Sequence, residues 1–262
     1  MIGKDEKFIN FIKDLKILGA SGMKLEFESE YLPEDKCLEI SNVLKSLEFD
    51  LVLKLGGASS LNDVWIAKNI NADTIVAPMV ESVYGFEKFI KTLLCVYSDY
   101  DLLNKKIYIN IETKTGIENF QSILEASCMK YITGIIIGRS DLSSSLNMSE
   151  TLTDSGEMYE IVYPVVEKCF NARKKVIMGG KISPASVSFL KKFKNGYLQG
   201  FETRKIFFPS DLLQKEDKDI SFAINKAIEF ELYWLQNYSA KNAPNASDID
   251  KRILALKNRC LA

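Results

Sequence analysis

The sequence predicts an α/β fold of the TIM (β/α)₈ type, with a helical extension at the C-terminal end. Short apolar runs alternate with amphipathic stretches along most of the 262 residues. Strands that are separated by helices in this way form parallel sheets. Seven such units in a chain long enough for one large core favour a closed barrel over an open sheet.

Seven segments have the character of buried strands: 23–28, 50–55, 74–78, 106–111, 134–138, 174–178 and 196–200. Helices are expected to begin at Pro33 and at Pro184, the latter with Ser183 as its cap, because proline suits the first helical turn. The first helical stretch runs almost directly into segment 23–28, so the first strand of the barrel is missing from the pattern. The eighth place is therefore empty, or filled by the tail or by a partner chain.

The chain divides into a catalytic barrel, residues 1–210, and a C-terminal segment, residues 211–262, of two or three helices. The segment contains the aromatic stretch "AIEFELYWLQNY". A large apolar helix face packs on its own barrel or on another subunit, and both readings stay open. We expect a homo-oligomer.

Composition excludes several kinds of chemistry. The chain has no histidine, which rules out Ser-His-Asp triads, Cys-His pairs and histidine zinc ligands. The five cysteines show no metal-binding or pairing rhythm and are expected to be reduced structural thiols. Any chemistry must therefore use carboxylates, Lys, Arg, Tyr, Cys, backbone groups or metal-bound water.

Charge and hydropathy restrict the partners. A net charge of −1 gives no sign of nucleic-acid binding. No apolar run is long enough to span a membrane, and the charged, helix-like N-terminal stretch lacks the features of a signal peptide. We expect a cytoplasmic protein whose partner is a small-molecule carboxylate.

Barrel enzymes place their reactive groups where the strands end. Glu112 directly follows one predicted strand and Asp141 follows the next, 29 positions later. These carboxylates should converge, and converging carboxylates repel each other unless a cation lies between them. Mg²⁺ or Mn²⁺ suits such a pair. The alternatives are that Glu112 caps the following helix or pairs with Lys54.

Several stretches resemble the HpcH/HpaI aldolase and citrate lyase β-subunit superfamily. The paired signature is "IYINIETKTGIENFQSIL" and "ITGIIIGRSDLSSSLN", supported by "ADTIVAPMVES" and "EFESEYLPEDK". The resemblance covers residues 22–208. It implies a TIM barrel in which Glu112 and Asp141 bind a divalent ion. That ion would hold a 2-oxo acid, or its enolate, while a carbon–carbon bond breaks or forms.

The resemblance also suggests substrate contacts. Lys54 lies where family members usually supply an arginine, so it is the expected catalytic cation and anion contact, with looser geometry than arginine would give. Arg139 is a second expected anion contact, and Arg204 is an alternative to it. The other reading is that both arginines form surface ion pairs. The backbone N–H groups of Ser140 and Asp141 are expected to bind the substrate carboxylate.

The departures from the family concern proton transfer. Tyr31 lies where pyruvate aldolases carry a histidine, and tyrosine is a poorer base at neutral pH. Glu28 partly matches an acidic pair of the citrate-lyase branch. Glu28, Glu30 and Tyr31 are therefore candidates for proton transfer. The alternative for Glu28 is that it orients metal-bound water or pairs with Lys54.

These observations predict a divalent-metal-dependent carbon–carbon lyase or aldolase. Its substrate would be a small 2-oxo acid, or a carboxylic acid or thioester that yields an enolate. Two other functions remain open because the family's histidine and arginine are replaced. One is a non-catalytic barrel kept for binding or assembly, and the other is metal-assisted hydrolysis on the same fold.

Overall fold

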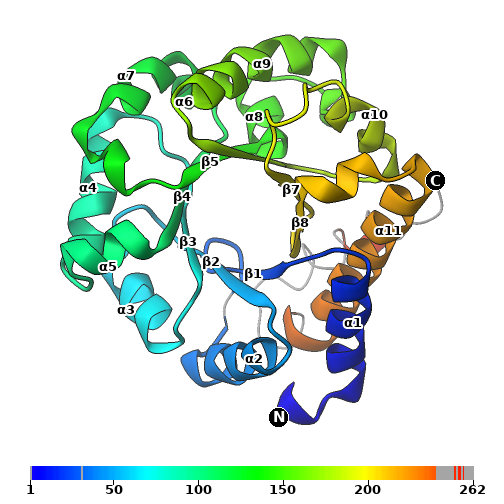
Figure 1. Ribbon diagram of the computed structural model, residues 1–262. Helices are drawn as coiled ribbons and strands as arrows, with labels where there is room; N and C mark the ends of the chain where they lie inside the picture. Colours follow the sequence, from blue (N-terminus) through cyan, green and yellow to red (C-terminus); the bar gives the residue numbers. More distant parts are fainter. Residues whose placement is uncertain (1, 31, 240–250, 252, 255, 257–262) are drawn as a thin grey trace.

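In the computed structural model the chain forms a closed eight-stranded barrel surrounded by helices (Figure 1). The structure describes residues 2–30, 32–239, 251, 253, 254 and 256. The strands follow one another around the barrel in chain order: β1 (Gly22–Glu26), β2 (Asp50–Lys54), β3 (Thr74–Ala77), β4 (Lys106–Ile111), β5 (Gly134–Gly138), β6 (Lys175–Gly179), β7 (Gly200–Glu202) and β8 (Ile206–Pro209). The predicted fold class is confirmed.

The first six predicted strands coincide with β1–β6 to within two residues at each end. The seventh prediction, 196–200, is wrong in position, because β7 begins only at Gly200. Gly196 has φ +85°, a left-handed conformation that belongs to a turn. The chain therefore turns before it enters the sheet.

The eighth place in the barrel is filled by β8, so it is neither empty nor taken by the tail or a partner. β8 runs antiparallel to both neighbours, pairing Phe207 with Gly22 of β1 and Phe208 with Phe201 of β7. A turn links β7 to β8, closed by a 2.9 Å hydrogen bond from Thr203 N to Ile206 O. No helix separates the two strands, so the alternation of strands and helices could not reveal β8.

Helices enclose the barrel: α1 (Glu6–Ile17), α2 (Glu34–Ser46), α3 (Leu61–Asn69), α4 (Val83–Leu94), α5 (Asp99–Asn104), α6 (Lys114–Glu118), α7 (Phe120–Glu125), α8 (Arg139–Ser145), α9 (Gly156–Asn171), α10 (Val187–Leu190) and α11 (Asp217–Trp234). Pro33 caps α2, and Ser183 with Pro184 begins the 3₁₀ turn that leads into α10, so both predicted helix starts are confirmed. None of the described helices is long and apolar enough to cross a membrane.

The C-terminal helix α11 packs against α1, with which it lies side by side in Figure 1. The ring of Phe8 lies 5.8 Å from that of Phe230 and 6.5 Å from that of Trp234. The Asp5 carboxylate accepts hydrogen bonds from the hydroxyls of Tyr233 and Tyr238. Helix α11 therefore packs on the chain's own N-terminal helix. Most residues after 239 lie outside the described part of the chain.

The barrel closes tightly at Gly134 in β5. A Cβ at this position would lie 2.3 Å from the Lys175 carbonyl oxygen and 2.7 Å from the Tyr108 ring. Alanine at position 134 is therefore expected to lower the free energy of unfolding by about 1–3 kcal/mol. Urea denaturation measures this, with Gly57→Ala as the matched control, because a Cβ there would meet nothing within 4 Å. Equal stability of the two variants would contradict the close approach.

Candidate active site

The main cluster of charged side chains lies in a cavity of about 250 Å³ at the end of the barrel where β1–β6 terminate. Such strand ends carry the reactive groups of barrel enzymes. The charged lining residues are Lys24, Glu26, Lys54, Glu112, Asp141, Lys181, Glu202, Arg204 and Glu231. They come from β1, β2, the ends of β4, β6 and β7, α8 and α11. The cavity therefore collects chemistry from segments far apart in the sequence.

Glu112, immediately after β4, is only 2% exposed. Its Oε1 accepts hydrogen bonds from Lys54 Nζ (3.3 Å) and from the Met79 N–H (3.1 Å), and its Oε2 accepts one from Asn110 Nδ2 (2.7 Å). Gly138 makes room for the carboxylate, because a Cβ there would lie 2.4 Å from Oε2. Thr113, and not Glu112, caps helix α6. Of the two alternatives to metal binding by Glu112, the structure therefore shows the ion pair with Lys54 and not the helix cap.

Lys54, the last residue of β2, contacts two acids. Its Nζ lies 2.6 Å from Glu28 Oε2 and 3.3 Å from Glu112 Oε1. Burial alone would lower the pKa of Lys54, but Glu112 and Glu28 outweigh it and hold the pKa well above its ordinary value. Lys54 is therefore cationic at neutral pH, and its closer partner is Glu28, which does not itself line the cavity.

Lys24 and Glu26 of β1 form a second ionic cluster, which the sequence reasoning missed. Lys24 Nζ lies 2.5 Å from Glu202 and 3.4 Å from Glu26, and Arg204 Nε lies 2.9 Å from Glu26. Burial would raise the pKa of Glu26, but Lys24 and Arg204 hold it well below its ordinary range. The signal was available, because two charged residues alternate within an apolar strand and so share one face of it.

Asp141 and Ser140 lie in the first turn of α8, and both line the cavity that Glu112 also lines. Asp141 is exposed to solvent. The structure thus brings the two expected metal-binding carboxylates, Glu112 and Asp141, to one cavity.

Arg139 faces elsewhere, which corrects its expected role as a substrate anion contact. Its guanidinium is fully buried and donates to the carbonyls of Gly179 (3.0 Å) and Gly180 (3.0 Å), and to Asp154 (2.5 Å). It also lies 4.5 Å from the centre of the Phe189 ring. These contacts join α8 to the end of β6. Arg204 is the arginine that lines the cavity.

Glu30 and Tyr31 have different outcomes. The Glu30 carboxylate accepts hydrogen bonds from Lys205 Nζ (2.6 Å) and Trp234 Nε1 (3.1 Å). It therefore ties the segment after β1 to α11, and it does not line the cavity. Tyr31 lies outside the described residues, so its candidate role in proton transfer stays a prediction.

The cavity's donor set fits a divalent ion held by two carboxylates. Among the described residues no three Cys, Asp or Glu side chains form a ready-made metal cluster. However, Glu112 and Asp141 share the cavity with Asn110, whose buried Oδ1 has no hydrogen-bond partner. All three offer oxygen, the ligand atom that Mg²⁺ and Mn²⁺ prefer. The lining also carries five acidic side chains against four basic ones, a small excess that a cation would offset.

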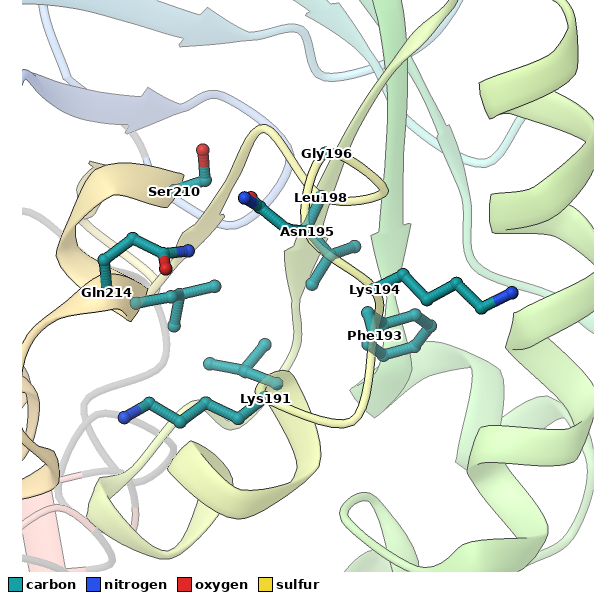
Figure 2. Close-up of a pocket in the computed structure, with 10 residues that line it drawn as sticks. Lys191, Phe193, Lys194, Asn195, Gly196, Leu198, Ser210 and Gln214 are labelled. Carbon is teal, nitrogen blue, oxygen red and sulfur yellow. The ribbon is translucent and has the colours of Figure 1, made fainter.

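Another cavity, of about 360 Å³, lies between the loop after α10 and the 3₁₀ turn Ser210–Gln214 (Figure 2). Figure 2 shows Ser210 and Gln214 on one side of it, with Asn195 and Lys191 on others. None of its lining residues is acidic, and Lys191 is paired with Asp217 at 2.5 Å. This cavity therefore lacks the groups that the predicted chemistry needs.

A closed barrel with carboxylates and buried cations at the strand ends has charged groups where barrel enzymes place their reactive residues. The model of the HpcH/HpaI aldolase/citrate lyase family matches residues 42–200. The chain belongs to this family, which confirms the predicted resemblance. A comparison with curated proteins finds no match.

Solved structures share the fold at low sequence identity. An HpcH/HpaI aldolase from Desulfitobacterium hafniense DCB-2 is 13% identical, with a TM-score of 0.61, over 74% of this chain and 81% of that one. The citrate synthase SbnG is 15% identical, with a TM-score of 0.59 and the same coverage. A family protein from Burkholderia cenocepacia J2315 is 11% identical, with a TM-score of 0.52, over 69% of this chain and 88% of that one.

Proposed function

We propose that this protein is a divalent-metal-dependent carbon–carbon lyase or aldolase. It acts on a small 2-oxo acid, or on a carboxylic acid or thioester that yields an enolate. One observation carries the proposal: Glu112 and Asp141 line a single cavity at the strand ends, together with the buried cation Lys54. Membership of an aldolase and citrate lyase family supports it.

Glu112 and Asp141 are the residues that would hold Mg²⁺ or Mn²⁺. When bound, such an ion supplies Lewis-acid polarisation of a carbonyl oxygen. Lys54 supplies a fixed positive charge beside Glu112, and such charges stabilise negative charge that develops on an enolate oxygen. The N–H groups of Ser140 and Asp141, with Arg204, bind the substrate carboxylate.

Proton transfer falls to Glu28 or Tyr31 in this proposal. Glu28 is the better supported of the two, because its carboxylate lies 2.6 Å from Lys54 and its side chain is 24% exposed. Its exposed part gives a route to bulk water, and its ion pair holds it beside Lys54, the cation proposed to contact the substrate. Lys54 itself remains charged and cannot act as a base.

Exchange of the C3 hydrogens of pyruvate for deuterium tests the proposal without knowledge of the second substrate. In D₂O with Mn²⁺ or Mg²⁺, wild-type protein is expected to catalyse the exchange, seen by proton NMR. Mn²⁺ with pyruvate should also raise the melting temperature, because both bind only the native state. Glu112→Gln is expected to lose both effects. Glu118→Gln, which alters an exposed acid on α6, should keep them.

The alternative of a barrel kept for binding or assembly is favoured by one observation. Lys54 already neutralises Glu112 without an ion. That reading predicts no exchange and no metal-dependent stabilisation with pyruvate, 2-oxobutyrate, oxaloacetate or acetyl-CoA. Such a result with folded protein would overturn the lyase proposal. Metal-dependent stabilisation without exchange would favour metal-assisted hydrolysis.

A further inference from the structure

The barrel contains a second cavity at its other end, where β2, β3, β4 and β6 begin. Its volume is about 340 Å³. The apolar walls are Val52, Tyr108, Ile136, Ile177 and Phe207. With Val76, they form a cluster separate from the main core between the sheet and the helices. Barrel interiors are normally packed with side chains, so an open space here calls for a cause.

The cause is the composition of the outermost lumen-facing positions. Side chains alternate across a strand, so the residue two positions before each lumen-facing residue also faces the lumen. These positions hold Gly22, Asp50, Thr74, Lys106, Gly134, Lys175 and Gly200. Three have no side chain, and the charged ones reach toward solvent. None of these seven positions on β1 to β7 holds a bulky apolar residue, so space is left open beside Phe207 of β8.

The acidic residue at the inner end of this cavity, Glu202, already has an ion-pair partner. Glu202 lines both this cavity and the candidate active site, and its carboxylate is 2.5 Å from Lys24 Nζ. The paired carboxylate needs no further cation from an occupant. Because the remaining walls are mainly apolar, burying an apolar group against them is favourable.

The rim carries a net positive charge. Asp50 pairs with Lys106 at 2.6 Å, whereas Lys175 is exposed and has no ion-pair partner within the described part of the chain. Burial, with a contribution from Asp50, raises the pKa of Tyr108 to about 12, so its hydroxyl stays protonated at neutral pH. The opening therefore presents a cation above an apolar interior.

From this arrangement we infer that this end of the barrel binds a small apolar monocarboxylic acid. The apolar body lies between Tyr108 and Phe207, and the carboxylate pairs with Lys175. The size agrees, because the volume is roughly twice the 150 Å³ of an engineered cavity that holds benzene. The site is separate from the proposed catalytic chemistry and does not depend on it.

Isothermal titration of the full chain with 2-naphthoate tests the inference. We expect a dissociation constant of about 0.1 mM, typical of a ligand with about a dozen heavy atoms. Lys175→Glu should weaken 2-naphthoate at least tenfold and leave the uncharged 2-naphthamide unchanged. Acetate, which lacks the apolar body, should not bind here. Lys91→Glu, an exposed change on α4, is the matched control.

Three results would overturn the inference. The first is no binding of 2-naphthoate to wild-type protein. The second is equal affinity in wild type and Lys175→Glu. The third is binding that survives Lys175→Glu but is lost in Lys54→Met, which would place the carboxylate at the other end of the barrel. Because pyruvate exchange is measured separately, this site and the lyase proposal can fail independently.

Discussion

Replacing Lys24 with methionine is expected to lower the free energy of unfolding by about 3–5 kcal/mol. The side chains of Lys24, Glu26 and Glu202 are each only 8% exposed. Removing the ammonium leaves Glu202 without its ion-pair partner and Glu26 with Arg204 alone. An unpaired buried charge costs far more than the same charge in water, so the loss should be large.

Urea denaturation of Lys24→Met measures this effect. Lys106→Met is the matched control, because the Lys106–Asp50 pair is as short, at 2.6 Å, but is 54% and 41% exposed. The control should lose less than about 1 kcal/mol. The double variant Lys24→Met/Glu202→Met should recover part of the loss, because it removes one of the stranded carboxylates. If the two lysine variants lose equal stability, the Lys24 cluster is not buried as described.

Most of the barrel was predictable because its strands repeat one physical pattern. Segments such as 106–111 and 134–138 are short, apolar and β-branched, and helices separate them from the next strand. β8 escaped because it follows β7 through a turn and pairs antiparallel to both neighbours. Its place depends on the whole barrel closing, which no local stretch of sequence encodes.

The candidate site was only partly predictable. Position after a strand predicted that Glu112 and Asp141 converge, and both line the same cavity because strand ends meet at one edge of the barrel. Arg139 is two residues from Asp141 at the start of α8, and residues two apart do not share a helix face. One therefore lines the cavity while the other is buried against the end of β6. Sequence proximity alone could not separate their roles.

The pairing of the buried charges could not be read from the sequence. Lys24 and Glu202 are 178 positions apart and meet only because β1 and β7 both flank β8. Glu231 reaches the same cavity from α11. Such contacts depend on the closure of the barrel and the docking of the C-terminal helix. Alternation within β1 indicated that Lys24 faces inward, but not which acid it meets.

Replacing Lys54 with methionine is expected to slow pyruvate exchange by about 10²–10³-fold, the cost of removing one group that stabilises developing negative charge. Arginine at position 54 should retain much of the rate, because it keeps the positive charge and adds a bidentate fork. Proton NMR at fixed Mn²⁺ concentration measures the rates, at a temperature where each variant is folded.

The affinity of Lys54→Met for Mn²⁺ should not fall along with its exchange rate. The ammonium of Lys54 lies 3.3 Å from Glu112 Oε1, so it competes with an ion for the same carboxylate. Without it, Glu112 should bind Mn²⁺ at least as tightly as in the wild type, as measured by isothermal titration. A purely structural role for Lys54 would lower the exchange rate and the metal affinity together. Slower exchange with undiminished metal binding would therefore identify Lys54 as the cation that acts on the substrate.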